Sequence, residues 1–203
     1  MQFDVLIIGG GPSGVSCALV LGSACTKPYA ADKKIGIISH QKSSALQQAL
    51  LYNVYGVAPE TLGTDLLTQS LDHLEKRYPH VAQISNEKVL KVSGEFPEFT
   101  VVTNKHTYQT RTIIVAIGWA NTFDIDGLLQ FVEPHRKSLA DKQRIQLKNT
   151  DHQVADGIYV AGTLAGWRNQ VAIASGSGAS VATDILTLWN GGINSQSHDS
   201  IKK

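Results

Sequence analysis

The chain has 203 residues, of which 42% are hydrophobic and 17% charged, and its 18 Lys and Arg nearly balance its 17 Asp and Glu. This composition predicts one globular domain that buries a core without disulfides or metals, and the low net charge excludes the basic footprint of a nucleic-acid-binding protein. No apolar run reaches the roughly 18 residues needed to span a bilayer, so we expect no membrane segment. The N-terminus has no basic stretch typical of a signal peptide. The two cysteines are too few for a disulfide scaffold, so we expect a cytoplasmic protein.

Two short apolar runs with a helical pattern between them open the chain. Residues 3–8 (FDVLII) end at three glycines and are typical of a buried parallel strand. Apolar and small residues then recur at spacings of three and four from Pro12, which predicts a helix that ends before Pro28. Residues 35–39 (IGIIS) predict a second strand. This order of elements favours an α/β sheet with parallel strands.

The middle of the chain predicts an amphipathic helix and a small antiparallel sheet. Leucines line one face of residues 64–78, and Pro79 closes that helix. Three short antiparallel strands are expected at residues 88–92, 98–103 and 107–109.

Two buried strands and a long helix complete the predicted domain. Residues 112–117 (TIIVAI) and 157–161 (GIYVA) each end at a glycine, and a helix is expected from about Asn169 to Trp189. Residues 191–203 are polar and predict a flexible tail. The fold class we expect is therefore α/β and Rossmann-like, with a central parallel sheet and a small antiparallel sheet.

The glycines after the first strand form the pattern Gly9-x-Gly11-x-x-Gly14. Gly9 permits a tight turn, Gly11 lets the backbone approach a pyrophosphate, and Gly14 lets the helix pack on the strand. The helix N-terminus offers free N–H groups to phosphates, and Pro12 suits its first position because no N–H is needed there. The pattern predicts a dinucleotide-binding loop.

The second strand departs from this pattern at its end. A carboxylate is expected there on the ribose hydroxyls, but the strand ends in Ser39-His40, and Asp32 lies before it. Either Ser39 or His40 replaces the carboxylate, or the adenosine end of the ligand is held less firmly.

Several further segments resemble one family. FDVLIIGGGPSG, Asn53 in YNVYG, TIIVAIG, GIYVAGT and the Asn169-Gln170-Val171 segment resemble motifs of the FAD-binding domain of the thioredoxin reductase-like pyridine nucleotide–disulfide oxidoreductases, over most of residues 1–118 and about 150–190. The resemblance implies an FAD-binding Rossmann-like fold. The cofactor-binding residues that it and the glycine pattern imply are Gly9, Gly11, Pro12, Ser13, Gly14, Ser39, His40, Asn53, Val89, Ala116, Gly118, Gly162, Thr163, Asn169, Gln170 and Val171.

Three departures from the family pattern matter for function. Thr163 stands where the family has an Asp on the ribityl chain, and a hydroxyl lacks the charge-assisted strength of a carboxylate. Residues 119–148 replace an inserted NAD(P)H-binding domain of over a hundred residues, so we expect residues 1–190 to form a single FAD-binding domain. The family's CxxC is also absent, and Cys17 and Cys25 would lie about 12 Å apart on a helix, which is beyond disulfide reach.

The remaining candidate residues are less informative. The seven histidines have no metal-ligand spacing, so we interpret them as surface or loop residues and expect no metal site; only His40 has a notable position. The truncated Gly176-Ser177-Gly178 pattern is more typical of close helix packing than of a nucleophile turn. Trp119 and Trp167 flank the expected flavin region, and either could stack on the flavin or pack in the core. No residue stands out as catalytic.

Three functions therefore remain open. The chain is an FAD-dependent oxidoreductase or electron-transfer component reduced by another protein or by diffusible NAD(P)H. Alternatively, it is a non-catalytic FAD-binding redox sensor, or a degenerate domain that has lost FAD at Ser39 and Thr163. The expected partner is a protein electron donor or acceptor, with no nucleic acid and no membrane, and nothing in the sequence excludes an oligomer.

Overall fold

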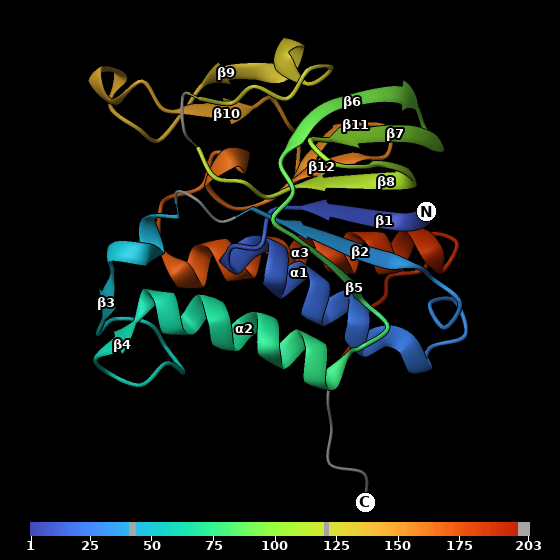
Figure 1. The fold of residues 1–203 in the computed structure, drawn as a ribbon, viewed down its shortest axis with the longest axis horizontal. Helices are drawn as coiled ribbons and strands as arrows, with labels where there is room; N and C mark the ends of the chain where they lie inside the picture. The colour runs from blue at the N-terminus through green and yellow to red at the C-terminus, as the bar shows by residue number, and fades with distance from the viewer. Residues whose placement is uncertain (41–43, 120–121, 199–203) are drawn as a thin grey trace, which may run out of the picture.

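The fold is known from a computed structural model that describes residues 1–40, 44–119 and 122–198. Its centre is an eight-stranded sheet in which five strands run parallel (Figure 1). Both halves of the chain contribute, because a strand near the C-terminus pairs with one from the middle. The parallel strands lie in the order β12 (Ile158–Val160), β8 (Thr107–Val115), β1 (Gln2–Ile8), β2 (Ile35–Ser39) and β5 (Ala82–Ser85), with β11 (Gln153–Ala155) antiparallel on β12.

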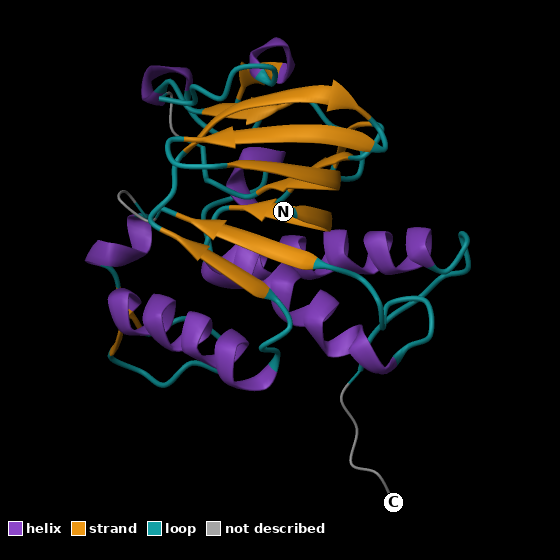
Figure 2. Cartoon of the chain, turned by 45° about the vertical axis from the view of Figure 1, so that its right-hand side comes forward, coloured by secondary structure: helices purple, strands orange, loops and turns teal. Residues whose placement is uncertain are grey.

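The three α-helices lie together on one side of the parallel strands (Figures 1 and 2). Both faces of β1 are buried, and its apolar side chains alternate between them. Val5 and Ile7 pack toward the helices, whereas Leu6 and Ile8 pack into the core on the other side. The helices are α1 (Pro12–Ser23), α2 (Gly63–Arg77) and α3 (Val171–Trp189).

The antiparallel strands β6 (Val89–Glu95) and β7 (Glu98–Thr103) extend the same sheet and pack against the other face of the parallel strands. β6 pairs with β7, and β7 pairs with the first half of β8, while the second half of that same edge pairs with β12. Two further hairpins are β3 (Leu50–Leu51) with β4 (Thr61–Leu62) and β9 (Val132–Pro134) with β10 (Ile145–Leu147). The short 3-10 helices are Ala24–Thr26, Ala45–Gln48, Leu129–Phe131, Ala140–Lys142 and Gly162–Ala165.

The expected fold class is confirmed, with corrections to single elements. The strands expected at 107–109 and 112–117 are one strand, β8, because its first half serves the antiparallel sheet and its second half the parallel sheet. The long helix begins at Val171, not at Asn169. β5 was not predicted, because its four residues (AQIS) carry no clear alternation.

Helix α3 and the segment after it both differ from what the sequence predicts. With 19 residues and a mean hydropathy of 1.3, α3 is long and apolar enough to cross a membrane by composition, contrary to the expectation that no such segment exists. Its Val181 and Ile185 lie in the core against α1, which is the place of a core helix. In the expected tail, Ser195 is buried and its N–H donates to Thr187 Oγ1, so the described part is held against α3.

Candidate cofactor-binding site

The glycine loop joins β1 to α1, and each of its glycines has a different role. Gly9 has a φ of +123°, and a Cβ there would lie 2.4 Å from the Ala116 carbonyl oxygen. A Cβ at Gly14 would lie 1.8 Å from the Gly9 carbonyl oxygen. At Gly11, a Cβ would meet nothing within 4 Å. Gly9 and Gly14 are therefore required for backbone packing, whereas Gly11 keeps space open before the N-terminus of α1.

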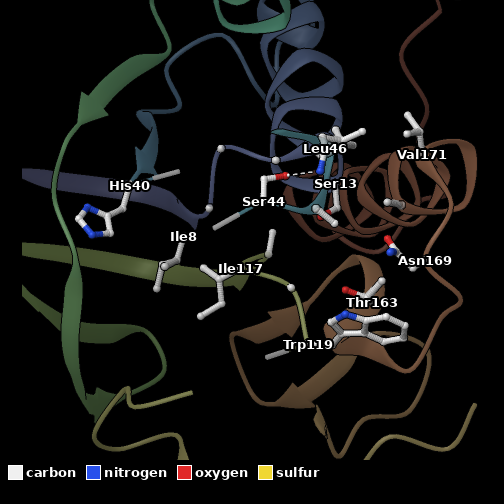
Figure 3. A pocket seen from close by; sticks show the side chains of 18 of the residues that line it. Ile8, Ser13, His40, Ser44, Leu46, Ile117, Trp119, Thr163, Asn169 and Val171 are labelled. Carbon is white, nitrogen blue, oxygen red and sulfur yellow. Dashed lines mark hydrogen bonds between the residues drawn. The ribbon is translucent and has the colours of Figure 1, made fainter. Parts of the chain in front are cut away.

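That space belongs to a cavity of about 740 Å³ at the C-terminal ends of the parallel strands (Figure 3). Its volume lies within the usual range of about 300–1,000 Å³ for cofactor sites, and its position is the usual one for ligands of open α/β sheets. The lining comes from segments far apart in the chain. It includes the glycine loop, His40, residues 44–46, Asn53, residues 87–89 and 116–119, Arg144, Thr163 and residues 169–171.

The structure brings most of the expected site residues together at this cavity. Three of them do not line it. Gly14 packs against Gly9, and Gly162 packs on Ser13, where a Cβ would lie 2.8 Å from the Ser13 hydroxyl oxygen. Ser39 is buried in the sheet. The expected residues that line the cavity are Gly9, Gly11, Pro12, Ser13, His40, Asn53, Val89, Ala116, Gly118, Thr163, Asn169, Gln170 and Val171.

His40 forms one end of the cavity, directly after β2. Its Nδ1 is buried and has no hydrogen-bond partner among the described residues. A buried polar atom without a partner is costly unless a ligand satisfies it. Because Ser39 is turned into the sheet, His40 is the residue at this strand end that is available to a ligand.

Glu87 lies beside this end and was missed by the sequence analysis. It is buried and accepts hydrogen bonds from Thr103 Oγ1 (2.6 Å), His106 Nδ1 (2.7 Å) and Tyr108 Oη (3.1 Å). Burial alone would raise the pKa of Glu87, but these hydrogen bonds outweigh it and hold the pKa below its ordinary value. The Glu87 carboxylate already accepts hydrogen bonds from these protein groups. We therefore interpret Glu87 as part of the wall of the cavity. Its partners come from β7, from β8 and from the turn between them, which no local pattern links to Glu87.

Two histidines support the opposite end; both lie in loops, as expected, but neither is at the surface. His135 and His152 are both buried. Trp167 Nε1, which can only donate, lies 3.1 Å from His152 Nε2, so this nitrogen accepts. The Ser177 hydroxyl also lies 2.9 Å from His152 Nε2 and accepts the N–H of Gly162. His152 therefore contacts Ser177, and Ser177 in turn is hydrogen-bonded to Gly162, which precedes Thr163.

Burial lowers the pKa of His152 in the folded protein. The unfolded chain, with an ordinary pKa near 6.5, therefore takes up protons first as the pH falls. The contribution of neutral His152 to the free energy of unfolding is fully present above about pH 6.5, and it is lost as the pH falls through the folded-state pKa. We expect the free energy of unfolding to drop between pH 7.5 and 5.5 in urea titrations. In His152→Gln, which keeps an acceptor but does not titrate, the drop should be smaller; an equal drop in both proteins would contradict this role.

Trp119 and Trp167, for which the sequence allows either stacking on the flavin or packing in the core, differ in position. Trp119 lines the cavity, where its indole lies near Thr163 in Figure 3. Trp167 does not line it; Lys137 Nζ lies 4.5 Å from the centre of its ring. Of the two, only Trp119 is placed to contact a ligand in this cavity.

The N-terminus of α3 also faces the cavity, although the helix begins at Val171 and not at about Asn169. Gln170 has extended dihedral angles (φ −138°, ψ 140°) and is the N-cap, so Val171 holds the first helical position. Asn169, at about which we expected the helix to begin, lies before it. Because the first N–H groups of a helix have no partner within it, this end can bind negative charge.

Within the part of the chain that the structure describes, the cysteines and acidic residues form no metal site. Cys17 is fully buried, which raises the pKa of its thiol far above the ordinary value. Cys17 and Cys25 are both free thiols, and neither lines the cavity. Among the described residues, no group of three or more His, Cys, Asp or Glu could hold a metal ion.

Known proteins resemble this chain in sequence and fold. Ferredoxin–NADP reductases of Leuconostoc citreum and Streptococcus mutans are 28% and 27% identical over 159 and 186 residues, which is 77% and 88% of this chain and 40% and 48% of those proteins. The chain thus spans less than half of these curated relatives. The structure of a thioredoxin reductase from Gloeobacter violaceus, 16% identical, has a TM-score of 0.72 and covers 99% of each chain. A ferredoxin-flavin thioredoxin reductase from Clostridium acetobutylicum has a TM-score of 0.66 at 17% identity, over 93% of this chain and 99% of that one.

The family itself is given by a sequence profile. The profile described as pyridine nucleotide-disulphide oxidoreductase matches residues 3–173, which include the glycine loop, Asn53, Gly118 and Thr163. The expected resemblance and the expected flavin family are confirmed. The chain belongs to the pyridine nucleotide-disulphide oxidoreductase family, whose members are FAD-binding flavoproteins.

Proposed function

We propose that this cavity binds FAD and that the protein is an FAD-dependent electron-transfer component. The observation that carries the proposal is one continuous cavity that extends from the β1–α1 glycine loop to the N-terminus of α3. The residues present fit the cofactor. Gly11 leaves space for a pyrophosphate at the start of α1, and His40 Nδ1, which has no partner among residues 1–40, 44–119 and 122–198, offers a hydrogen bond to a ribose hydroxyl.

These two contacts fix the orientation of FAD within the proposal. The pyrophosphate lies at the glycine loop, and the adenosine lies toward His40, because the end of β2 is the ribose side of this fold. The flavin therefore lies at the other end, beside Thr163, Asn169 and Val171. Asn53 reaches the same cavity from the β3–β4 hairpin.

Bound FAD would supply the electron-accepting and electron-donating chemistry. The protein's residues would bind it, orient it and stabilise the negative charge of its reduced ring. No dithiol takes part, because the chain has no CxxC and Cys17 is inaccessible. The names of the relatives support a protein partner such as ferredoxin or thioredoxin. The free thiols fit a reducing compartment such as the cytoplasm.

Anaerobic reduction of the FAD-loaded protein tests the function. The flavin absorbance should bleach when a reduced electron carrier such as ferredoxin is added, and the electrons should return to an oxidised acceptor. The same experiment with NADPH and NADH identifies the donor class. A bound flavin that only dithionite reduces would favour a redox-inert FAD-binding module instead.

The N-terminus of α3 gives a specific prediction for the flavin. Val171→Pro removes one N–H at the first helical position, where proline is well tolerated, and Gln170 already has the extended conformation required before proline. We expect the midpoint potential of the bound flavin to fall, because its reduced, anionic form loses a hydrogen-bond donor. Val171→Ala keeps the N–H and is the control. Equal potentials in the two variants would show that this N–H does not reach the flavin.

A further inference from the structure

The side chain of Trp119 lies at the end of the cavity where the proposed function places the flavin. Trp119 follows β8, is half-buried, and lies near Thr163 and Asn169 in Figure 3. It is the only Trp or Tyr among the described residues that line the cavity. The other two tryptophans lie elsewhere: Trp167 packs on His152 and Lys137, and Trp189 ends α3 near Lys33.

The β9–β10 hairpin holds Trp119 in a defined position. The N–H of Ile145 donates to the Trp119 carbonyl oxygen at 3.2 Å. The His135 ring meets the indole edge-on, with centroids 4.9 Å apart and planes at 80°, and the Arg144 guanidinium lies 5.1 Å from the ring centre. These contacts come from β10 and from both ends of the loop that joins β9 to β10, so the indole is restrained by three residues of the hairpin.

The residues that hold the indole are themselves fixed. His135 Nδ1 accepts the N–H of Lys137 (3.1 Å), so its Nε2 carries the proton and donates to the Thr163 carbonyl oxygen (3.0 Å). Arg144 forms no ion pair with any carboxylate of the described residues, and it lines the cavity. The hairpin therefore brings the indole, the Arg144 guanidinium and the Thr163 turn together at one end of the cavity.

We propose that Trp119 is a positioning residue that stacks on the isoalloxazine of bound FAD, and that the β9–β10 hairpin serves to hold it there. The inference rests on the proposed function. It follows from the orientation of FAD in the cavity, because the adenosine end is occupied by His40 and the Glu87 network, and Trp119 lies at the opposite end. An indole ring offers the flat, electron-rich face that favours contact with another planar ring system.

Flavin fluorescence and FAD affinity test the inference without reference to activity. A stacked indole quenches flavin fluorescence, whereas phenylalanine, which is a poor electron donor, does not. In Trp119→Phe loaded with FAD, we expect fluorescence several-fold above the wild type, and in Trp119→Ala, FAD binding about three- to ten-fold weaker. Trp189→Phe, far from the cavity, is the matched control and should match the wild type in both measurements. Arg144→Gln, which loosens the indole, should give an intermediate fluorescence.

The outcomes separate this inference from the proposed function. If the wild type does not bind FAD, the proposed function fails. If FAD binds and Trp119→Phe fluoresces as weakly as Trp189→Phe, the stacking role is wrong while FAD binding stands. If Trp119→Phe does not fold, the wild type decides: bound FAD that fluoresces as strongly as an unquenched flavin would overturn the stacking role, and strong quenching would support it.

Discussion

Replacing Gly11 with alanine should weaken FAD binding about ten-fold or more while leaving the stability of the FAD-free protein unchanged. A Cβ at this position meets no protein atom within 4 Å, and the φ of −80° is one that alanine adopts freely. The methyl group instead enters the cavity at the N-terminus of α1, where the pyrophosphate must approach the backbone. A loss of ten-fold corresponds to about 1.4 kcal/mol.

The measurement is a titration of the FAD-free protein with FAD, followed by flavin fluorescence or calorimetry, together with thermal melting of the FAD-free form. Gly176→Ala, on the exposed face of α3 and outside the cavity, is the control for a glycine-to-alanine change. If Gly11→Ala binds FAD as tightly as the wild type does, the phosphates do not lie at this loop.

Alanine at two positions of α3 should have opposite effects on stability. A Cβ at Gly178 would lie 1.9 Å from the backbone oxygen of Ser13, where α3 and α1 pack with their backbones in close contact. Gly178→Ala must push the two helices apart, and we expect a cost of about 3 kcal/mol or more, which is a fall of about 10 °C in Tm. At Gly176, a Cβ meets nothing within 4 Å, so alanine should stabilise the helix by about 0.5–1 kcal/mol.

Thermal and urea unfolding of the two variants check this pair of expectations. The two substitutions are chemically identical and two residues apart on one helix, so differences in helix propensity cancel. A Gly178→Ala protein as stable as Gly176→Ala would mean that α1 and α3 do not approach as closely as described.

Much of the site could be predicted from the sequence, because its central residues belong to local motifs. The positions of the three glycines could be predicted because Gly9 and Gly14 are required for close backbone packing and Gly11 leaves space at the start of α1. Gly118, Thr163 and Val171 could be placed because the segments that contain them resemble motifs of the family. Strand ends of a parallel sheet meet at one edge, so these segments had to converge.

The residues that sequence reasoning missed depend on contacts between distant segments. Glu87 is buried because partners from β7 and β8 fold over it, and no local spacing indicates this. His135 and His152 resembled loop histidines because they lie in short, irregular elements, yet each is fixed by a contact about 25 residues away or more. The start of α3 was misplaced by one residue or two because Asn169 is the better cap by side-chain preference, while the backbone turns at Gln170.

The central claim is that the cavity between the glycine loop and α3 binds FAD. The most direct measurement is the absorbance spectrum of the purified protein, before and after incubation with excess FAD and gel filtration, with release of the cofactor by acid. We expect a flavin spectrum, FAD in the acid supernatant, and about one FAD per chain after loading, as one dinucleotide loop predicts. A folded protein that is colourless and retains no FAD after this treatment would contradict the account.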